Sequence, residues 1–124
     1  MDAVKDEHSE RPVASAWRPT FHAVIEAFVQ GDYALARGVR SVAPVSAMTA
    51  QQIEAYILDY GERLAELPDE TWNTSVALWM GTRWEVIVDL WTVESGRSDM
   101  VLMADVFEAS EGSYRIEIHS VHVP

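Results

Sequence analysis

The spacing of apolar residues changes once along this chain, and that change limits the fold more than any other feature. Before about residue 68, apolar side chains recur every three or four positions, which is the spacing of one face of an α-helix. From Thr71 onward they alternate with polar residues, which is the spacing of a half-buried β-strand. The sequence therefore predicts an α+β domain, with helices in its first half and strands in its second.

Three helical segments are expected in the first half. The first begins at Pro19 and carries an apolar stripe that extends to Val29. A short second helix is expected over residues 32–36. The third begins with a capping box formed by Thr49 and Gln52. Its apolar face is formed by Ile53, Tyr56, Ile57, Tyr60 and Leu64.

Four strands are expected in the second half, at about 72–80, 84–94, 99–108 and 113–122. The connections between them are short and contain Gly81, Gly96 and Gly112, which suits hairpins. The strands then form an antiparallel meander in chain order. We expect a two-layer domain over residues 17–124, with the helices packed on one face of a four-stranded sheet. Residues 1–16 are polar and are expected to form a flexible N-terminal arm.

A register for this sheet follows if apolar residues share a face and each hairpin has a three-residue loop. Val76 then pairs with Val88, Val88 with Ala104, and Ala104 with Ile118. These residues, with Trp72, Leu78 and Trp84, are expected to face the helices, whereas Val121 is expected on the opposite face. The face turned away from the helices mixes large apolar side chains with acids, whereas a solvated face is mostly polar. Such a surface suits recognition of a partner. Its candidate binding residues are Trp79, Glu85, Asp89, Trp91, Asp105, Phe107, Glu117 and His119.

Three other readings of that face remain open. The arm could fold over it, two copies of the chain could stack through it, or the register could be shifted by two residues. In the first two cases the face would be covered, and in the third its rows would change while its residues stayed the same.

Asp105 and Glu117 lie directly opposite each other in this register, and like charges in that position destabilise a sheet unless something offsets them. A shared proton, a hard cation such as Ca²⁺ or Mg²⁺, or a basic side chain of a partner could do so. We expect these two carboxylates either to be exposed to water or to be offset by a basic side chain of a partner. We expect no metal site.

No catalytic or cofactor motif is present. Ser75, Asp89 and His119 share a row, but Ser75 and His119 would lie roughly 14 Å apart, which is too far for a catalytic triad. His122 follows His119 by three residues, so the two are expected on opposite faces. We therefore expect no catalytic residues and no cofactor.

The charge balance favours a protein partner. Nine basic residues against twenty acidic ones give a net charge of −11, which repels nucleic acid and attracts a basic protein. The chain has no cysteine, no apolar run long enough to cross a bilayer and no signal-like N-terminus. A cytoplasmic protein with no membrane contact is expected.

The run from Trp84 to Glu94, WEVIVDLWTVE, and the following Gly96-Arg97-Ser98-Asp99 resemble a family of small uncharacterised bacterial proteins. The segment 67–72 is also similar to that family, and the resemblance covers roughly residues 20–124. It implies a fold but no catalytic residues. In size and acidity the chain is also similar to toxin-immunity proteins, which implies a binding role.

These observations predict a non-enzymatic protein-binding module, of which an immunity-type inhibitor of a basic bacterial toxin is the most concrete form. Its acidic sheet face, or an adjoining edge strand, would hold the partner. One alternative is a small-ligand or pocket-enzyme domain, whose cavity between helices and sheet would use Tyr56, Tyr60, Trp72, Asp59 or Glu62. A homo-oligomer, such as a homodimer that buries the sheet face, is the other.

Overall fold

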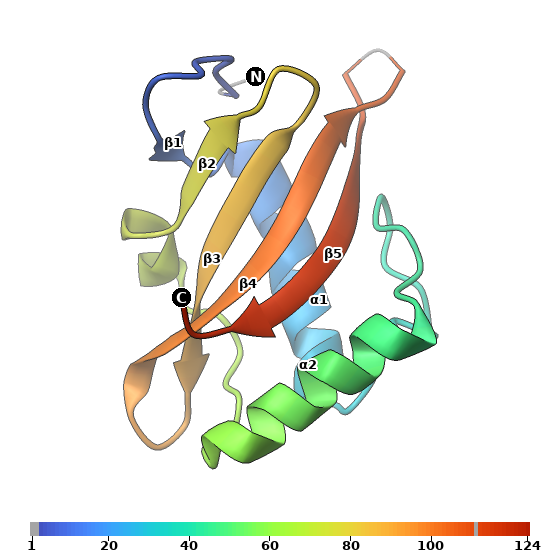
Figure 1. Ribbon diagram of the computed structural model, residues 1–124, viewed down its shortest axis with the longest axis vertical. Coiled ribbons are helices and arrows are strands. Elements are labelled where there is room, and N and C mark those ends of the chain that lie inside the picture. The colour runs from blue at the N-terminus through green and yellow to red at the C-terminus, as the bar shows by residue number, and fades with distance from the viewer. Residues whose placement is uncertain (1–2, 111) are drawn as a thin grey trace.

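A computed structural model describes residues 3–110 and 112–124 (Figure 1). It confirms the α+β class, with two α-helices packed on an antiparallel sheet. The elements, in chain order, are β1 (Arg11–Pro12), the 3₁₀ turn η1 (Ser15–Trp17), α1 (Arg18–Val29), α2 (Ala47–Tyr60), the 3₁₀ turn η2 (Asp69–Asn73), β2 (Val76–Trp79), β3 (Trp84–Thr92), β4 (Gly96–Glu108) and β5 (Tyr114–His122). No helix in these ranges is long and apolar enough to cross a membrane.

The sheet has five strands in the order β1-β2-β3-β4-β5, so the expectation of four is wrong. The additional strand, β1, comes from the expected arm, where Arg11 pairs with Ala77 and Pro12 with Val76. Two residues are too few to show an alternating pattern, so this strand leaves no signal in the sequence. The next residue, Val13, is fully buried in the core.

Helix α1 follows the expected pattern closely. Pro19 lies in its first turn, where a missing N–H costs nothing, and the stripe is buried. The buried residues are Phe21, Val24, Ile25 and Phe28. Val29 was expected in the same stripe, but its side chain is 42% exposed because the helix ends there.

The start of α2 differs from the expected capping box. Ser46 is the N-cap, and its hydroxyl accepts the N–H of Thr49 at 3.2 Å. The Gln52 side chain instead reaches β5. Gly61 ends the helix in the left-handed region, at φ 84°, which glycine adopts without steric cost.

Residues 32–36 form turns rather than the expected second helix. The Asp32 carboxylate accepts the backbone N–H groups of Ala36 and Arg37 at 2.8 and 3.2 Å, so it stabilises a turn and does not cap a helix. Leu35 has a positive φ of 55°, which breaks a helical path.

The core lies between the sheet and the two helices, with α1 behind the sheet in Figure 1. Its largest fully buried side chains include Trp17 and Phe21. Trp17 meets Trp84 edge to face, at 5.1 Å between ring centroids. Trp72 and Trp84 are both buried, as expected, although Trp72 belongs to η2 and not to a strand.

The β2–β3 hairpin has a different register from the predicted one. Val76 pairs with Ile87 and Trp79 with Trp84, because Met80 and Arg83 close a turn of only two residues, Gly81 and Thr82. A change from three loop residues to two exchanges the faces of β2. Ala77 and Trp79 therefore point toward the helices, and Val76 and Leu78 point away from them.

The β3–β4 pairing is shifted by two residues from the prediction, so Val88 faces Leu102 and the faces are kept. An irregularity lies between Asp89 and Trp91. There the Ser98 hydroxyl donates to the Leu90 carbonyl at 2.8 Å, in place of a backbone group. Side-chain bonding of this kind is not visible in the apolar pattern.

The β4–β5 register is confirmed, because Ala104 faces Ile118 and Asp105 faces Glu117. Beyond these pairs a bulge adds one residue to β5, so Met103 faces Ser120 instead of His119. The bulge turns Val121 into the core, where it is fully buried. Val121 was expected on the opposite face.

The free side of β5 is bonded at three points by other segments. Ile116 exchanges backbone hydrogen bonds with Ser41 and Ala43, at 2.8 and 2.9 Å. The Gln52 amide of α2 donates to the Val121 carbonyl at 2.8 Å and accepts the Val121 N–H. The Val123 N–H donates to the Tyr56 hydroxyl at 3.0 Å.

Candidate functional site

The outer face, defined as the face of β2–β5 that points away from α1, is the first candidate site. In Figure 1 no helix crosses in front of these strands. Seven of the eight predicted binding residues are on this face by strand alternation or contact. They are Glu85, Asp89, Trp91, Asp105, Phe107, Glu117 and His119.

Trp79 is the exception. It pairs with the buried Trp84, and the two rings lie 4.6 Å apart between centroids. The Lys5 ammonium lies 5.0 Å from the Trp79 ring centroid. The expected place of Trp79 on the outer face was wrong, because the two-residue turn puts it on the side that faces the helices.

The centre of the outer face is apolar. One row across the strands contains Val76, Ile87 and Met103, all half-buried. Leu78 lies in the next row, beside Glu85. Val76 and Leu78 were expected in the core, so the outer face is more apolar than the sequence predicts.

Asp105 lies at the centre of the charged part of this face. It faces Glu85 on β3 and Glu117 on β5, yet the residue is only 7% exposed. Its Oδ2 atom accepts hydrogen bonds from Arg83 Nε at 3.2 Å and from His119 Nε2 at 2.6 Å. The chain's own side chains therefore offset the row of acids, which is a fourth possibility beyond a shared proton, a metal or a partner's cation.

The other acids of the face differ in their partners. Glu117 accepts a hydrogen bond from Arg115 at 2.9 Å, and Asp89 accepts one from the Thr74 hydroxyl. In the described chain the Glu85 carboxylate, which is half-buried, makes no hydrogen bond or ion pair. Glu85 is therefore the carboxylate of this row that is available to a partner.

Aromatic and basic side chains complete the face. The Arg115 guanidinium lies 4.9 Å from the Phe107 ring centroid, directly across from it in the sheet. Trp91 lies at the far end opposite Arg97 and packs partly against the core. Sequence reasoning missed Arg83, because its reach to Asp105 depends on the turn geometry and the register.

The bulge at His119 changes the expected position of the two histidines. His119 bonds Asp105 and His122 pairs with Val101, so both are on the outer face and not on opposite faces. His122 Nδ1 lies 2.9 Å from the Ser120 hydroxyl. Across residues 3–110 and 112–124, no group of three or more His, Asp or Glu side chains is placed to hold a metal ion.

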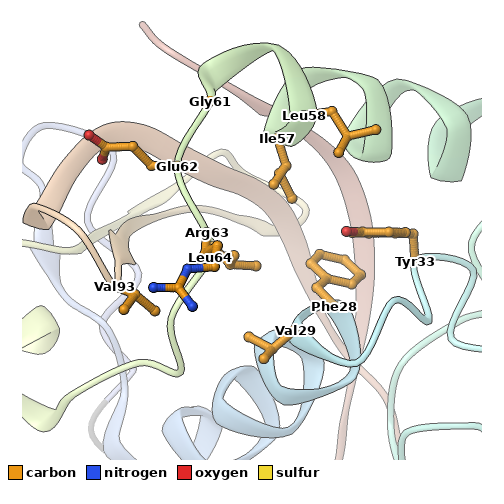
Figure 2. Close-up of a pocket in the computed structure, with 10 residues that line it drawn as sticks. All are labelled: Phe28, Val29, Tyr33, Ile57, Leu58, Gly61, Glu62, Arg63, Leu64 and Val93. Carbon is orange, nitrogen blue, oxygen red and sulfur yellow. The ribbon is translucent and has the colours of Figure 1, made fainter.

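A hollow of about 560 Å³ between the ends of α1 and α2 is the second candidate site (Figure 2). Glu62 lines it, as expected for a ligand cavity, but Tyr56, Tyr60, Asp59 and Trp72 do not. Those three aromatic side chains bond other groups: the hydroxyls of Tyr56 and Tyr60 accept the N–H groups of Val123 and Asp99, and the Trp72 indole donates to His22.

Comparison with known proteins agrees with the expected membership of an uncharacterised family. A family model described as a domain of unknown function, DUF7668, matches residues 25–124. The chain therefore belongs to this family. No curated protein and no solved structure matches it.

Proposed function

We propose that this protein is a non-enzymatic binding protein that holds a basic protein partner on the outer face of its sheet. The observation that carries the proposal is an open sheet face with large apolar side chains at its centre and carboxylates beside them. Sheet faces without a covering layer are usually polar, and contiguous apolar patches at a surface mark interaction sites.

The charge on this face favours a basic partner. Its central rows hold four carboxylates, those of Glu85, Asp89, Asp105 and Glu117. They face two arginines, Arg83 and Arg115. The face remains acidic after these pairs form, and the net charge of −11 extends the same sign over the chain. A field of this sign speeds the approach of a basic protein and orients it.

In this proposal the two kinds of side chain have different roles. Ile87, Met103 and Leu78 would lose water on contact and supply most of the binding energy. Glu85 would accept a Lys or Arg from the partner, because its carboxylate has no partner in the described chain. An immunity-type inhibitor, which covers a basic toxin, is the specific form we propose.

The test compares two charge reversals that change the net charge equally. Glu85→Lys alters the outer face, whereas Glu66→Lys alters an exposed position in the loop before η2. Each purified protein would be immobilised and exposed to lysate of its native host at low and at high salt. Bound proteins would be identified by mass spectrometry, and the affinity of any purified partner would then be measured.

The proposal expects a basic protein retained by the wild type and by Glu66→Lys, lost with Glu85→Lys, and weakened by salt. Equal retention by both variants contradicts it, because the general charge would then be responsible and not the outer face. Capture of the same chain alone would show that a second copy covers the face.

A further inference from the structure

The hollow of Figure 2 lies away from the outer face and has a different chemical character. Its floor is formed by Phe28, Ile57 and Leu64, which are all at least 93% buried. Its volume of about 560 Å³ falls within the range of pockets that hold small molecules. It is therefore large enough for a ligand without any movement of the helices.

The rim of the hollow exposes apolar side chains from three separate elements. Val29 ends α1, Leu58 lies near the end of α2, and Val93 follows β3. Their side chains are 42%, 70% and 57% exposed, whereas a side chain of this type gains free energy when it leaves water. Single exposed apolar residues are ordinary, but three that converge around one concavity indicate a binding site.

The two charged residues that line the hollow, Glu62 and Arg63, already make hydrogen bonds within the described chain. The two Glu62 carboxylate oxygens accept hydrogen bonds from the hydroxyls of Thr92 and Ser95, both at 2.7 Å. Arg63 donates from its side chain and its backbone to Glu94, again at 2.7 Å. The Glu62 carboxylate and the Arg63 Nε therefore already have hydrogen-bond partners, and an ionic ligand would have to compete with these bonds.

The hydroxyl of Tyr33 is a polar group of the hollow that is still available. Figure 2 shows the Tyr33 hydroxyl directed toward the space between Ile57 and Phe28, and no hydrogen bond to it is present among the described residues. Burial raises the pKa of this hydroxyl, and the nearby Glu54 charge raises it further. The group is therefore protonated at neutral pH and can donate to a ligand oxygen.

We propose that this hollow binds a small, uncharged, mainly apolar molecule that carries one hydrogen-bond acceptor. The apolar body rests on Phe28, Ile57 and Leu64, and the acceptor, a hydroxyl or carbonyl oxygen, meets the Tyr33 hydroxyl. This site is independent of the protein partner on the outer face.

The experiment uses three probes with the same six-carbon chain: 1-hexanol, hexanoate and hexylamine. Each is titrated into the ¹⁵N-labelled protein while amide chemical shifts are recorded. We expect saturable shifts at the residues that line the hollow, with 1-hexanol bound more tightly than either charged probe. A charged head group would lose its water and would have to compete with the bonds that Glu62 and Arg63 already make within the chain.

Three variants test the residues. Tyr33→Phe removes the donor and is expected to weaken 1-hexanol binding by about threefold to tenfold, the loss of one neutral hydrogen bond. Leu58→Glu replaces an apolar rim side chain with a charge and is expected to weaken it by about fivefold or more. Met48→Glu is the matched control, because Met48 is on the same helix, is 82% exposed and does not line the hollow.

Several outcomes would overturn the proposal. It is wrong if no probe gives saturable shifts at the hollow, since the apolar rim would then serve some larger partner or none. Equal affinities in Leu58→Glu and Met48→Glu would also reject it. Tighter binding of hexanoate or hexylamine than of 1-hexanol would contradict the uncharged class of ligand.

Discussion

Replacing Asp105 with Asn tests whether the chain itself stabilises the row of acids across its sheet. The substitution keeps the shape of the side chain and removes its charge. Asp105 lies between Glu85 and Glu117, and a single oxygen accepts from both Arg83 and His119. If these two donors offset the repulsion, removal of the charge should destabilise the protein.

The magnitude follows from the two hydrogen bonds. A bond to a charged group contributes about 1.5–3 kcal/mol and a neutral one about 0.5–1.5 kcal/mol, so full neutralisation costs roughly 2–3 kcal/mol. The side chains of Arg83 and His119 are 33% and 47% exposed, which reduces that figure by about half. The substitution also removes repulsion from the neighbouring acids, which lowers this cost by a few tenths of a kcal/mol. We expect a net loss of about 1 kcal/mol.

The assay is urea unfolding at neutral pH, followed by tryptophan fluorescence, with a thermal scan beside it. For a chain of 124 residues, about 1 kcal/mol corresponds to a lower Tm by about 3–5 °C. Glu117→Gln is the control, because its carboxylate and its Arg115 partner are 39% and 55% exposed. Such a surface pair contributes little, so its loss should change the free energy of unfolding by less than about 0.5 kcal/mol.

An Asp105→Asn protein as stable as the wild type, or more stable, would refute this reasoning. Repulsion in the row would then exceed the two bonds, and the offset would have to come from outside the described chain. A loss from Glu117→Gln as large as that from Asp105→Asn would likewise show that burial of Asp105 is not the deciding factor.

Two further predictions concern the loop and turn around α2. Hydrogen bonds from the Arg63 side chain, and then from its backbone N–H, lower the pKa of Glu94 below its ordinary value of 4.5. A carboxylate with a lowered folded pKa adds stability above its unfolded pKa and loses it as the pH falls through the folded pKa. Glu94→Gln should therefore be less stable than the wild type at pH 7, and urea unfolding should show the difference shrinking in acid; a constant difference would exclude this linkage. Gly61→Ala places a side chain at φ 84° and should cost about 1 kcal/mol by the same assay, while an unchanged midpoint would mean that the turn adapts.

The elements of this fold could largely be predicted because their signals are local. The α1 stripe and the alternation in β3 depend on residues close in sequence, and both are observed. The turn Gly81-Thr82 shows where this approach fails, because Gly81 suits loops of two or three residues equally well. That single difference moved Trp79 off the outer face.

The acidic residues of the candidate site could be predicted, but their partners could not. Asp105 opposite Glu117 follows from the hairpin register and is observed. Arg83 reaches Asp105 from a turn 22 positions away, and His119 bonds it from a bulge. Apart from Glu62, the lining of the hollow was missed for a similar reason, since Val29, Leu58 and Val93 come from three segments that only the packed fold brings together.

The bonds along β5 bear on how this protein behaves at high concentration. A bare edge strand presents unpaired N–H and C=O groups to any other chain, and is a starting point for aggregation. Here the backbones of Ser41 and Ala43 bond the N–H and C=O groups of Ile116, and the Gln52 side chain bonds both backbone groups of Val121. A foreign strand would have to displace these bonds before it could extend the sheet. Gln52 thus occupies edge groups through which a second chain could pair, a role that the folding stability of a single chain would not reveal.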